Sequence, residues 1–333
     1  MKAIQMNAPG GPDVLIVTDI PIPALTSPSS VLVKLHAAGV NPIDTKVRKL
    51  NMYYPDKLPS ILGCDGAGVV ESVGSSVTRV HPGDEVFFFN NGLGYPAGTY
   101  AEYTVVQEDY LALKPKNLSM LEAAGIPLAL ITAWEALINR GDLREGNSTL
   151  IHAGAGGVGH IAIQLAHYFN ALIATTISSP QKAELVQSLG AELAIDYSQQ
   201  DFVEATLNWT NGLGARLIVD TVGGDTFCKS FAATRLYGRV VTLLSTTCDI
   251  KLTSTARLRN LSIGYVQITA PLYFGLHSAR VAQTRILERG AKLFEQGILK
   301  VHIGLELPLE QAAEAHRLIE AGHTAGKIVL RIV

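Results

Sequence analysis

The sequence predicts an α/β protein with two domains, one an antiparallel β-barrel and the other a doubly wound parallel sheet. The chain has 333 residues, enough for about two domains of the usual ~100–200 residues each. Over roughly the first 120 residues, short β-rich runs follow one another too closely for the crossover helices that parallel strands require. Farther along, apolar strands alternate with helical stretches, which is typical of a parallel sheet covered by helices.

The predicted strands of the first part are short and are bounded by turn-forming residues such as Pro82, Gly83 and Asp84. We place these strands at Lys2–Met6, Val31–Ala38, Ala67–Val73, Glu85–Phe89 and Tyr100–Val106. Their spacing favours an antiparallel, barrel-like arrangement.

The second part begins with a helix through Ala129–Asn139 and an apolar strand at Thr149–His152. A glycine loop and a helical stretch to Phe169 follow, and strands then alternate with helices. The alternating elements are Ala171–Ile177, Gln181–Leu189, Leu193–Ile195, Phe202–Asn208, Leu217–Asp220, Thr226–Ala233, Arg239–Leu244 and Leu261–Val266. Two helices and a closing strand come last, at Ala279–Gln296, Leu309–Ala321 and Lys327–Ile332.

Composition excludes several classes of function. The chain carries 27 Lys and Arg against 29 Asp and Glu, a net charge of −2, so it lacks the basic face of a nucleic-acid or anionic-membrane binder. The longest mostly apolar run, Ala123–Trp134, is interrupted by Pro127 and is shorter than the ~20 residues that span a bilayer. Three cysteines give no disulfide framework, so we expect reduced thiols and a cytoplasmic protein.

The strongest chemical signal is a glycine-rich loop between a predicted strand and a predicted helix. It contains Ala155, Gly156, Gly157, Val158 and Gly159 and fits an A-x-x-G-x-x-G variant of the dinucleotide fingerprint. A pyrophosphate needs bare backbone N–H groups at the positive end of a helix, and glycine permits the close approach. The loop therefore predicts a dinucleotide site; the alternative is a tight turn that binds no ligand.

The end of the next strand favours NADPH over NADH. An NAD site usually places an acidic residue there to bind the ribose 2′-hydroxyl. Here Ser178, Ser179 and Lys182 follow the strand, and the first acid is Glu184, inside the next helix. Hydroxyls and an ammonium suit a 2′-phosphate. Alternatively, Ser179 only caps the helix and Lys182 is solvated.

Catalytic zinc has little support in the sequence, because it needs three protein ligands and an open position. His160 and His167 lie seven residues apart on one helix face, too far for joint chelation. Cys64 has no Cys or His neighbour in sequence, and we expect it to be a buried structural thiol. The segment Gly322–Lys327 departs from the spacing of a phosphate-binding P-loop, and we expect it to be a turn into the last strand.

Five segments in order then point to a family. They are Gly39–Arg48 (G-V-N-P-I-D-T-K-V-R), Gly63–Val70, Pro82–Val86, Thr99–Tyr103 and the glycine loop. Together they resemble the zinc-independent, zeta-crystallin-like quinone oxidoreductases of the medium-chain dehydrogenase/reductase superfamily, and the likeness covers nearly the whole chain. Zinc-bearing relatives have a cysteine where Asn41 stands and a histidine where Cys64 stands, and they insert a four-cysteine lobe that this sequence lacks.

The resemblance implies a GroES-like β-barrel catalytic domain, residues 1–122 and 268–333, around a Rossmann NADP-binding domain, residues 123–267. It also implies a homodimer formed along an edge of the Rossmann sheet. By analogy, the nicotinamide and the substrate pocket are lined by Asn41, Asp44, Arg48 and either Tyr53 or Tyr54, since the tyrosine loop departs from the usual pattern. The residues expected to line the cofactor, besides those of the glycine loop and Ser178 and Ser179, are Thr132, Lys182, Tyr197, Val222 and Leu244.

The predicted function is hydride transfer from NADPH to a quinone or an α,β-unsaturated carbonyl compound without a metal ion. Such acceptors tolerate negative charge without a Lewis acid, so donors such as the Asn41 amide and a Tyr53 or Tyr54 hydroxyl suffice. In a more conservative interpretation, Asn41 and Pro42 only shape a turn and Asp44 and Arg48 form a surface ion pair. Two alternatives remain: an NADPH-binding sensor or accessory protein without turnover, and a zinc alcohol dehydrogenase.

Overall fold

A computed structural model describes residues 1–322 and 324–333 and divides them into two compact units. The first unit, the barrel unit, comprises residues 1–128, 269–297 and 301–333. The second unit, the nucleotide unit, comprises residues 129–268 and 298–300. Within the described residues, no helix combines the length and apolar character needed to span a bilayer.

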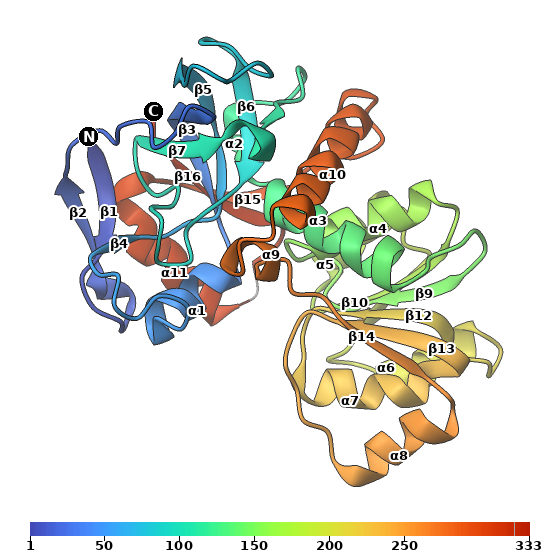
Figure 1. Cartoon of the computed structure of the whole chain (residues 1–333). Coiled ribbons are helices and arrows are strands. Elements are labelled where there is room, and N and C mark those ends of the chain that lie inside the picture. Colours follow the sequence, from blue (N-terminus) through green and yellow to red (C-terminus); the bar gives the residue numbers. More distant parts are fainter. Residues whose placement is uncertain (323) are drawn as a thin grey trace. The chain divides into compact units, whose positions relative to one another are not determined.

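The barrel unit is built on a seven-stranded sheet with the order β15-β16-β3-β5-β6-β8, in which β7 also pairs with β3 (Figure 1). A three-stranded sheet, β2-β1-β4, lies in the same unit. Apart from the parallel pair β15 and β16, neighbouring strands run antiparallel. The strands are β1 Lys2–Met6, β2 Leu15–Asp19, β3 Ser30–Val40, β4 Ser60–Ile61, β5 Asp65–Val73, β6 Glu85–Phe89, β7 Tyr103–Gln107, β8 Ala112–Leu113, β15 Ile303–Pro308 and β16 Lys327–Arg331.

The last strand of the chain completes this sheet, because β16 pairs with β3 and sets Ile328 opposite Val40. The register therefore carries Lys327 to the end of β3, where Asn41 begins the next turn. The core beneath the sheet is formed by Val, Leu and Phe side chains that include Val33, Leu35 and Phe88. Two segments almost three hundred residues apart in the chain are thus fixed side by side.

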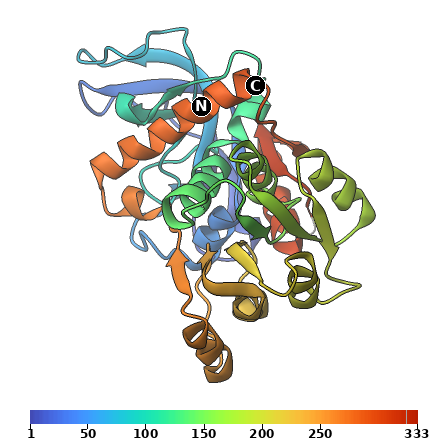
Figure 2. The same cartoon turned by 90° about the vertical axis from the view of Figure 1, so that its right-hand side faces the viewer.

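Helices surround this sheet. They are α1 Pro42–Leu50, α2 Met120–Ala124, α9 Ala270–Tyr273, α10 His277–Glu295 and α11 Ala312–Ala321, with single 3₁₀ turns at Pro12–Val14, Glu108–Tyr110 and Leu309–Gln311. The long helix α10 packs along β6, β8 and the turn Glu108–Tyr110 (Figures 1 and 2). Helix α1 packs on α11 and begins at Pro42, whose fixed φ and missing N–H suit the first helical position.

The nucleotide unit holds a six-stranded, fully parallel sheet with the order β11-β10-β9-β12-β13-β14. Its strands are β9 Ser148–Ile151, β10 Leu172–Ile177, β11 Leu193–Asp196, β12 Ala215–Asp220, β13 Thr234–Thr242 and β14 Ser262–Tyr265. Counted from β9, this is the 3-2-1-4-5-6 order of the Rossmann fold. The predicted combination of a barrel-like antiparallel domain and a doubly wound parallel sheet is confirmed.

Helices cover both faces of the parallel sheet. Helix α4 lies on one face, and α6, α7 and α8 pack against one another on the other face (Figure 1). The helices are α3 Pro127–Trp134, which continues as a wider helical turn at Glu135–Arg140, then α4 Gly159–Tyr168, α5 Pro180–Ser188, α6 Phe202–Trp209, α7 Gly224–Ala233 and α8 Ile250–Leu258. The core between the sheet and α7 includes Leu150, Ile218, Phe227 and Phe231.

Some elements escaped the sequence prediction. Helix α1 interrupts the part of the chain expected to be only strands, and α8 and β15 were not predicted. The predicted strand at Tyr100–Val106 begins three residues later, at Tyr103, because the backbone of Tyr100 bonds instead to Leu62 and to Ile4 of β1. The predicted turn at Gly322–Lys327 includes His323, which lies outside the described residues; β16 begins at Lys327.

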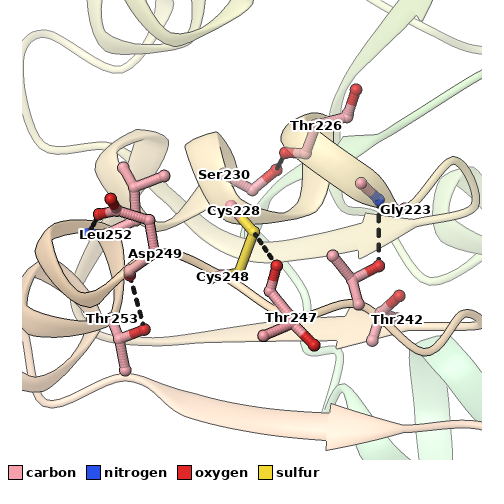
Figure 3. The surroundings of a disulfide bond; sticks show 12 residues. Gly223, Thr226, Cys228, Ser230, Thr242, Thr247, Cys248, Asp249, Leu252 and Thr253 are labelled. Atoms are coloured by element: carbon pink, nitrogen blue, oxygen red, sulfur yellow. Dashed lines mark hydrogen bonds between the residues drawn. A yellow bond between two sulfur atoms is a disulfide. The ribbon is translucent and has the colours of Figure 1, made fainter.

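The expectation of reduced thiols is wrong for two of the three cysteines. Cys228 on α7 and Cys248 in the segment after β13 form a disulfide, and the Cys228 sulfur also faces the carbonyl of Thr247 (Figure 3). Twenty residues separate the pair in sequence, and the βα packing brings them together. Disulfides are rare in cytosolic proteins, so this bond removes the argument from reduced thiols to the cytoplasm. Cys64 is buried and free, as predicted.

Candidate functional site

The glycine loop lies at the carboxyl end of β9, between that strand and α4. Gly156, Gly157 and Val158 are half-buried, whereas the residues on either side of them are buried. Within the described residues, the cap position Val158 makes no side-chain bond to the first turn of α4. The positive end of α4 therefore carries backbone N–H groups that no cap side chain satisfies, which is the arrangement that accepts a phosphate.

Two glycines of this loop are required by close packing. A Cβ at Gly154 would meet Thr175 Oγ1 at 2.0 Å, and a Cβ at Gly159 would meet the Ala153 carbonyl at 2.3 Å. At Gly156 the nearest atom to such a Cβ is the Ala153 carbonyl at 3.1 Å, a much milder contact. Gly154 and Gly159 thus serve helix–strand packing. The backbone of Gly156 is already bonded within the loop, since its N–H donates to the Ala153 carbonyl at 2.9 Å and its carbonyl accepts the His160 N–H at 3.1 Å.

Ser178, Ser179 and Lys182 meet at the carboxyl end of the neighbouring strand β10. The Lys182 ammonium donates to Ser178 Oγ at 3.1 Å, and Ser179 Oγ accepts the backbone N–H of Lys182 at 3.4 Å as the N-cap of α5. Ser179 therefore does cap the helix, as the conservative interpretation held. Lys182 is half-buried and bonded to Ser178, so it lies beside the hydroxyl with which it was expected to act.

Three further predicted cofactor residues lie at the same edge of the parallel sheet. Tyr197 follows β11 and is 55% exposed, and Val222 follows β12 and is 47% exposed. Leu244 follows β13 and lies beside the turn after β12, where a Cβ at Gly223 would meet its Cδ1 at 2.9 Å. Thr132 is buried on α3. In open α/β sheets, ligands bind at this carboxyl edge.

In the barrel unit, the predicted residue Asn41 belongs to a buried polar cluster. Its amide Nδ2 donates to Asp65 Oδ2 at 2.9 Å, and its Oδ1 accepts a hydrogen bond from the Lys327 ammonium. Lys327 Nζ is also 3.5 Å from Asp65 Oδ2, and the other Asp65 oxygen accepts the Leu128 N–H at 2.8 Å. Asn41, Asp65 and Lys327 are each less than 5% exposed, so the ion pair of Asp65 with Lys327 and the Asn41 amide are shielded from water.

Asp44 joins the same cluster from the first turn of α1. Its Oδ2 accepts the Asn41 backbone N–H at 2.8 Å and the Tyr100 hydroxyl at 3.0 Å. Burial, together with the nearby Asp65 carboxylate, raises the pKa of Asp44 to about 7. Burial also raises the pKa of Asp65 and raises that of the Cys64 thiol well above its usual range.

Arg48, on the next turn of α1, bonds groups other than Asp44. Its guanidinium donates to Glu320 at 2.5 Å and to the Gly10 carbonyl at 3.0 Å, and it lies 3.4 Å from His316 Nδ1. Arg48 is 1% exposed and Asp44 is 0% exposed. The interpretation of these two residues as a surface ion pair is therefore wrong. Both are internal supports that fix α1 against the barrel and α11.

The groups around Asn41 do not suit a zinc ion. A zinc site needs neutral imidazole, thiolate or carboxylate donors converging on an open position. Here the Lys327 ammonium bonds the Asn41 oxygen and pairs with Asp65, and burial disfavours the thiolate of Cys64. Among residues 1–322 and 324–333, no cluster of three or more His, Cys, Asp or Glu side chains has a geometry that could hold a metal.

The two candidate tyrosines have different surroundings. The Tyr53 hydroxyl lies 3.3 Å from Thr269 Oγ1, and its ring packs on Tyr273. Tyr54 lines a cavity of about 370 Å³ inside the barrel unit, beside Asn90, Tyr95 and Arg280. Burial raises the pKa of Tyr54, so its hydroxyl remains a hydrogen-bond donor at neutral pH. Tyr54 therefore faces this cavity.

Sequence reasoning missed the partners of the predicted residues. Asp65, Tyr100, His316 and Lys327 were given no role, although each bonds to Asn41, Asp44 or Arg48. No spacing rule joins these positions, because the register of β3 with β16 and the packing of α1 on α11 bring them together. Burial of an ionisable residue is the signal that could have found them, and it requires the fold.

Two family models match parts of the chain. Residues 27–116 match the family model "Alcohol dehydrogenase GroES-like domain", and residues 189–330 match "Zinc-binding dehydrogenase". The second model carries zinc in its description, whereas the donor groups around Asn41 do not fit that metal.

Relatives that match along the whole chain identify the family more narrowly than the two family models do. The chain is 34% identical to a quinone oxidoreductase from Pseudomonas aeruginosa over 329 residues, which covers 99% of each chain. It is 34% identical to the chloroplastic NADPH-dependent alkenal/one oxidoreductase of Arabidopsis thaliana, covering 99% of this chain and 79% of that protein. The crystal structure of an Escherichia coli quinone oxidoreductase complexed with NADPH superposes with a TM-score of 0.88 at 29% identity, covering 100% of both chains. With the fold, the glycine loop and these relatives in agreement, the chain belongs to the quinone oxidoreductase family of the medium-chain dehydrogenase/reductase superfamily.

Proposed function

We propose that this protein reduces a quinone or an α,β-unsaturated carbonyl compound with NADPH and without a metal ion. The observation that carries the proposal is the position of Lys327, whose ammonium bonds Asn41 and pairs with Asp65 in the buried cluster. A fixed cation among these donors leaves no room for a Lewis-acid metal. The acceptor must therefore be one that stabilises added electrons by itself.

NADPH would be held by the carboxyl edge of the parallel sheet. The backbone N–H groups of the half-buried Gly157 and Val158, at the start of α4, would bind its pyrophosphate. Lys182 and Ser178 would bind the 2′-phosphate, with no acidic residue among Ser178–Lys182 to repel it. When bound, the cofactor supplies a hydride from C4 of its reduced nicotinamide. The Arabidopsis and E. coli relatives, which are described with NADPH, support this assignment.

The chain's own residues would stabilise the charge that develops on the acceptor. When a hydride is added to the β-carbon of an enone, an electron pair moves onto the carbonyl oxygen, and the enolate then takes a proton from water at the α-carbon. The Tyr54 hydroxyl, which is protonated at neutral pH and whose pKa burial raises further, would donate to that oxygen. Asn41, which is 1% exposed and bonded to Asp65 and Lys327, would support the start of α1 instead of contacting the acceptor.

Asp44 and Arg48 would hold α1 in place without contacting the substrate. Asp44 holds the start of α1 through the Asn41 N–H, and Arg48 ties the end of that helix to Glu320. This assignment changes their role from lining the substrate pocket to supporting the residues that do so.

We also propose a homodimer that extends the parallel sheet. Strand β14 is at one edge of the sheet, and its side chains Ile263 and Tyr265 are 42% and 56% exposed. An edge strand with exposed apolar side chains is suited to pairing with a second copy. Sedimentation equilibrium would test this; a monomer at micromolar concentration would contradict it.

The function is tested by following the oxidation of NADPH at 340 nm with 1,4-benzoquinone and with an enone such as 3-penten-2-one. We expect turnover with at least one acceptor, and no loss of rate after dialysis against a chelator. Binding of NADPH without any hydride transfer would instead favour a sensor or accessory protein. Stoichiometric zinc in the purified protein, with activity lost on its removal, would favour a zinc alcohol dehydrogenase.

A further inference from the structure

The cavity of about 370 Å³ beside Tyr54 has an arginine side chain in its wall and no acidic side chain among the described residues that line it. It lies entirely within the barrel unit, where residues of the segments 20–26, 90–97 and 103–107 line it together with Met1, Tyr54, Ile61, Leu272 and Arg280. Its walls include the apolar and aromatic side chains of Ile61, Tyr54, Tyr95 and Leu272. Arg280 supplies a positively charged side chain in this wall.

Arg280 is half-buried and is held in place by neutral partners. Its Nη2 donates to Asn90 Oδ1, and its guanidinium carbon lies 3.5 Å from the centroid of the Tyr110 ring. Stacking on a ring face leaves the in-plane N–H groups of a guanidinium available for hydrogen bonds. In the part of the chain that the structure describes, no carboxylate lies within ion-pair distance of Arg280. The side chains that raise the pKa of Arg280 are two tyrosines, Tyr110 and Tyr54.

The group remains charged despite its burial. Desolvation lowers the pKa of Arg280 to about 10, which is still well above neutral pH. Burying a guanidinium partly without a carboxylate partner costs desolvation free energy, and a bound anion would offset that cost. The planar fork of an arginine matches a carboxylate in two parallel hydrogen bonds.

We propose that this cavity is a carboxylate subsite, in which Arg280 binds an acid group of the acceptor while Tyr54, Tyr95, Ile61 and Leu272 pack on its apolar body. The inference rests on the proposed function and narrows its substrate class. The preferred acceptors are then amphipathic, an electron-poor alkene or quinone joined to a carboxylate. In the purely structural alternative, Arg280 serves only to tie α10 to the segment after β6 through Asn90.

The first experiment compares two acceptors that differ in charge. The probes are 3-benzoylacrylate, an enone with a phenyl ring and a carboxylate, and its neutral amide. We expect kcat/KM with NADPH to be about 10- to 100-fold higher for the acid, the range of a charge-assisted bidentate contact. Equal values, or a preference for the amide, would overturn the subsite and leave the reductase proposal intact.

The second experiment removes the guanidinium. Arg280→Gln should abolish the preference for the acid and change kcat/KM for the amide little, whereas Arg280→Lys should retain part of the preference because it keeps the charge without the fork. Arg285→Gln is the matched control, since Arg285 is exposed on the same helix and does not line the cavity. If Arg280→Gln lowers the rates for both acceptors equally, Arg280 is a structural tie.

A third measurement does not depend on turnover. The saturated acid 3-benzoylpropionate has no conjugated alkene to reduce, so calorimetry measures its binding alone. We expect binding to wild type and to Arg285→Gln, and at least a tenfold weaker affinity for Arg280→Gln. A protein that turns over no acceptor but binds this acid through Arg280 would refute the reductase and keep the subsite. Failure of wild type to bind it would overturn the subsite.

Discussion

The glycine loop and the buried cluster around Asn41 differ in how their groups are brought together for the proposed function. The loop works through the backbone of one continuous segment, Gly154–Gly159, set between β9 and α4. The cluster works through side chains from four segments that lie far apart in sequence, represented by Asn41, Asp65, Tyr100 and Lys327. The first region is accessible at the edge of a sheet, and the second is closed off from water.

This difference decides what could be predicted from the sequence. The strand, the glycines and the helix of the loop follow each other in order, so their spacing alone predicted the fold of the nucleotide unit and the edge at which we propose that the cofactor binds. In the cluster, only Asn41, Asp44 and Arg48 were identified, and that came from the family resemblance. Their partners depend on strand pairing that no local pattern encodes: Asp65 on the pairing of β5 with β3, and Lys327 on that of β16 with β3.

The disulfide shows the same limit. Cys228 and Cys248 lie in different elements, and sequence gives no measure of the distance between α7 and the segment after β13. Counting three cysteines suggested reduced thiols, yet an odd number is compatible with one bond and one buried free thiol. Long-range contacts therefore changed the interpretation in both units.

The largest effect is expected from Lys327→Met, which leaves the buried Asp65 without its counter-charge. Breaking a buried ion pair from one side costs about 3–5 kcal/mol of unfolding free energy. The double variant Asp65→Asn with Lys327→Met removes both charges and should be milder than the single variant. Urea unfolding of both variants measures the difference. Wild-type stability in the single variant would show that this pair is not charged in the folded protein.

The next largest effect is the change in unfolding free energy with pH that Asp44 contributes. Because burial raises its pKa from 3.8 to about 7, the folded state holds a proton that the unfolded state releases between these values. Its contribution to stability is thus complete below about pH 4 and is lost as pH rises through about 7. Between pH 5 and pH 8 the loss is about 2–3 kcal/mol.

Asp44→Asn removes this titration and keeps an oxygen for the Asn41 N–H and the Tyr100 hydroxyl. The pKa of His316 is lowered to about 3 by burial and Arg48, so His316 contributes stability with the opposite sign, lost as pH falls. The difference between wild type and Asp44→Asn isolates Asp44. Parallel curves of unfolding free energy against pH for the two proteins would contradict the raised pKa.

A smaller effect, on the accessible edge, is expected from Lys182→Glu. The carboxylate would replace the ammonium that bonds Ser178 and would repel a 2′-phosphate. We expect KM for NADPH to rise about 10- to 100-fold, the range of a charge-assisted contact, with KM for NADH changing far less. Steady-state kinetics with both cofactors measures the ratio. An unchanged cofactor preference would exclude Lys182 from the phosphate site.

The smallest effect should come from Ser179→Ala, which separates folding from binding at that same edge. Ser179 accepts the Lys182 N–H as the N-cap of α5, and losing such a cap costs about 1 kcal/mol. If its function is capping alone, the midpoint of thermal unfolding falls by a few degrees while the NADPH-to-NADH ratio stays at the wild-type value. A changed ratio at unchanged stability would mean that the hydroxyl contacts the cofactor. The accessible region would then depend on side chains as well as backbone, as the buried cluster does.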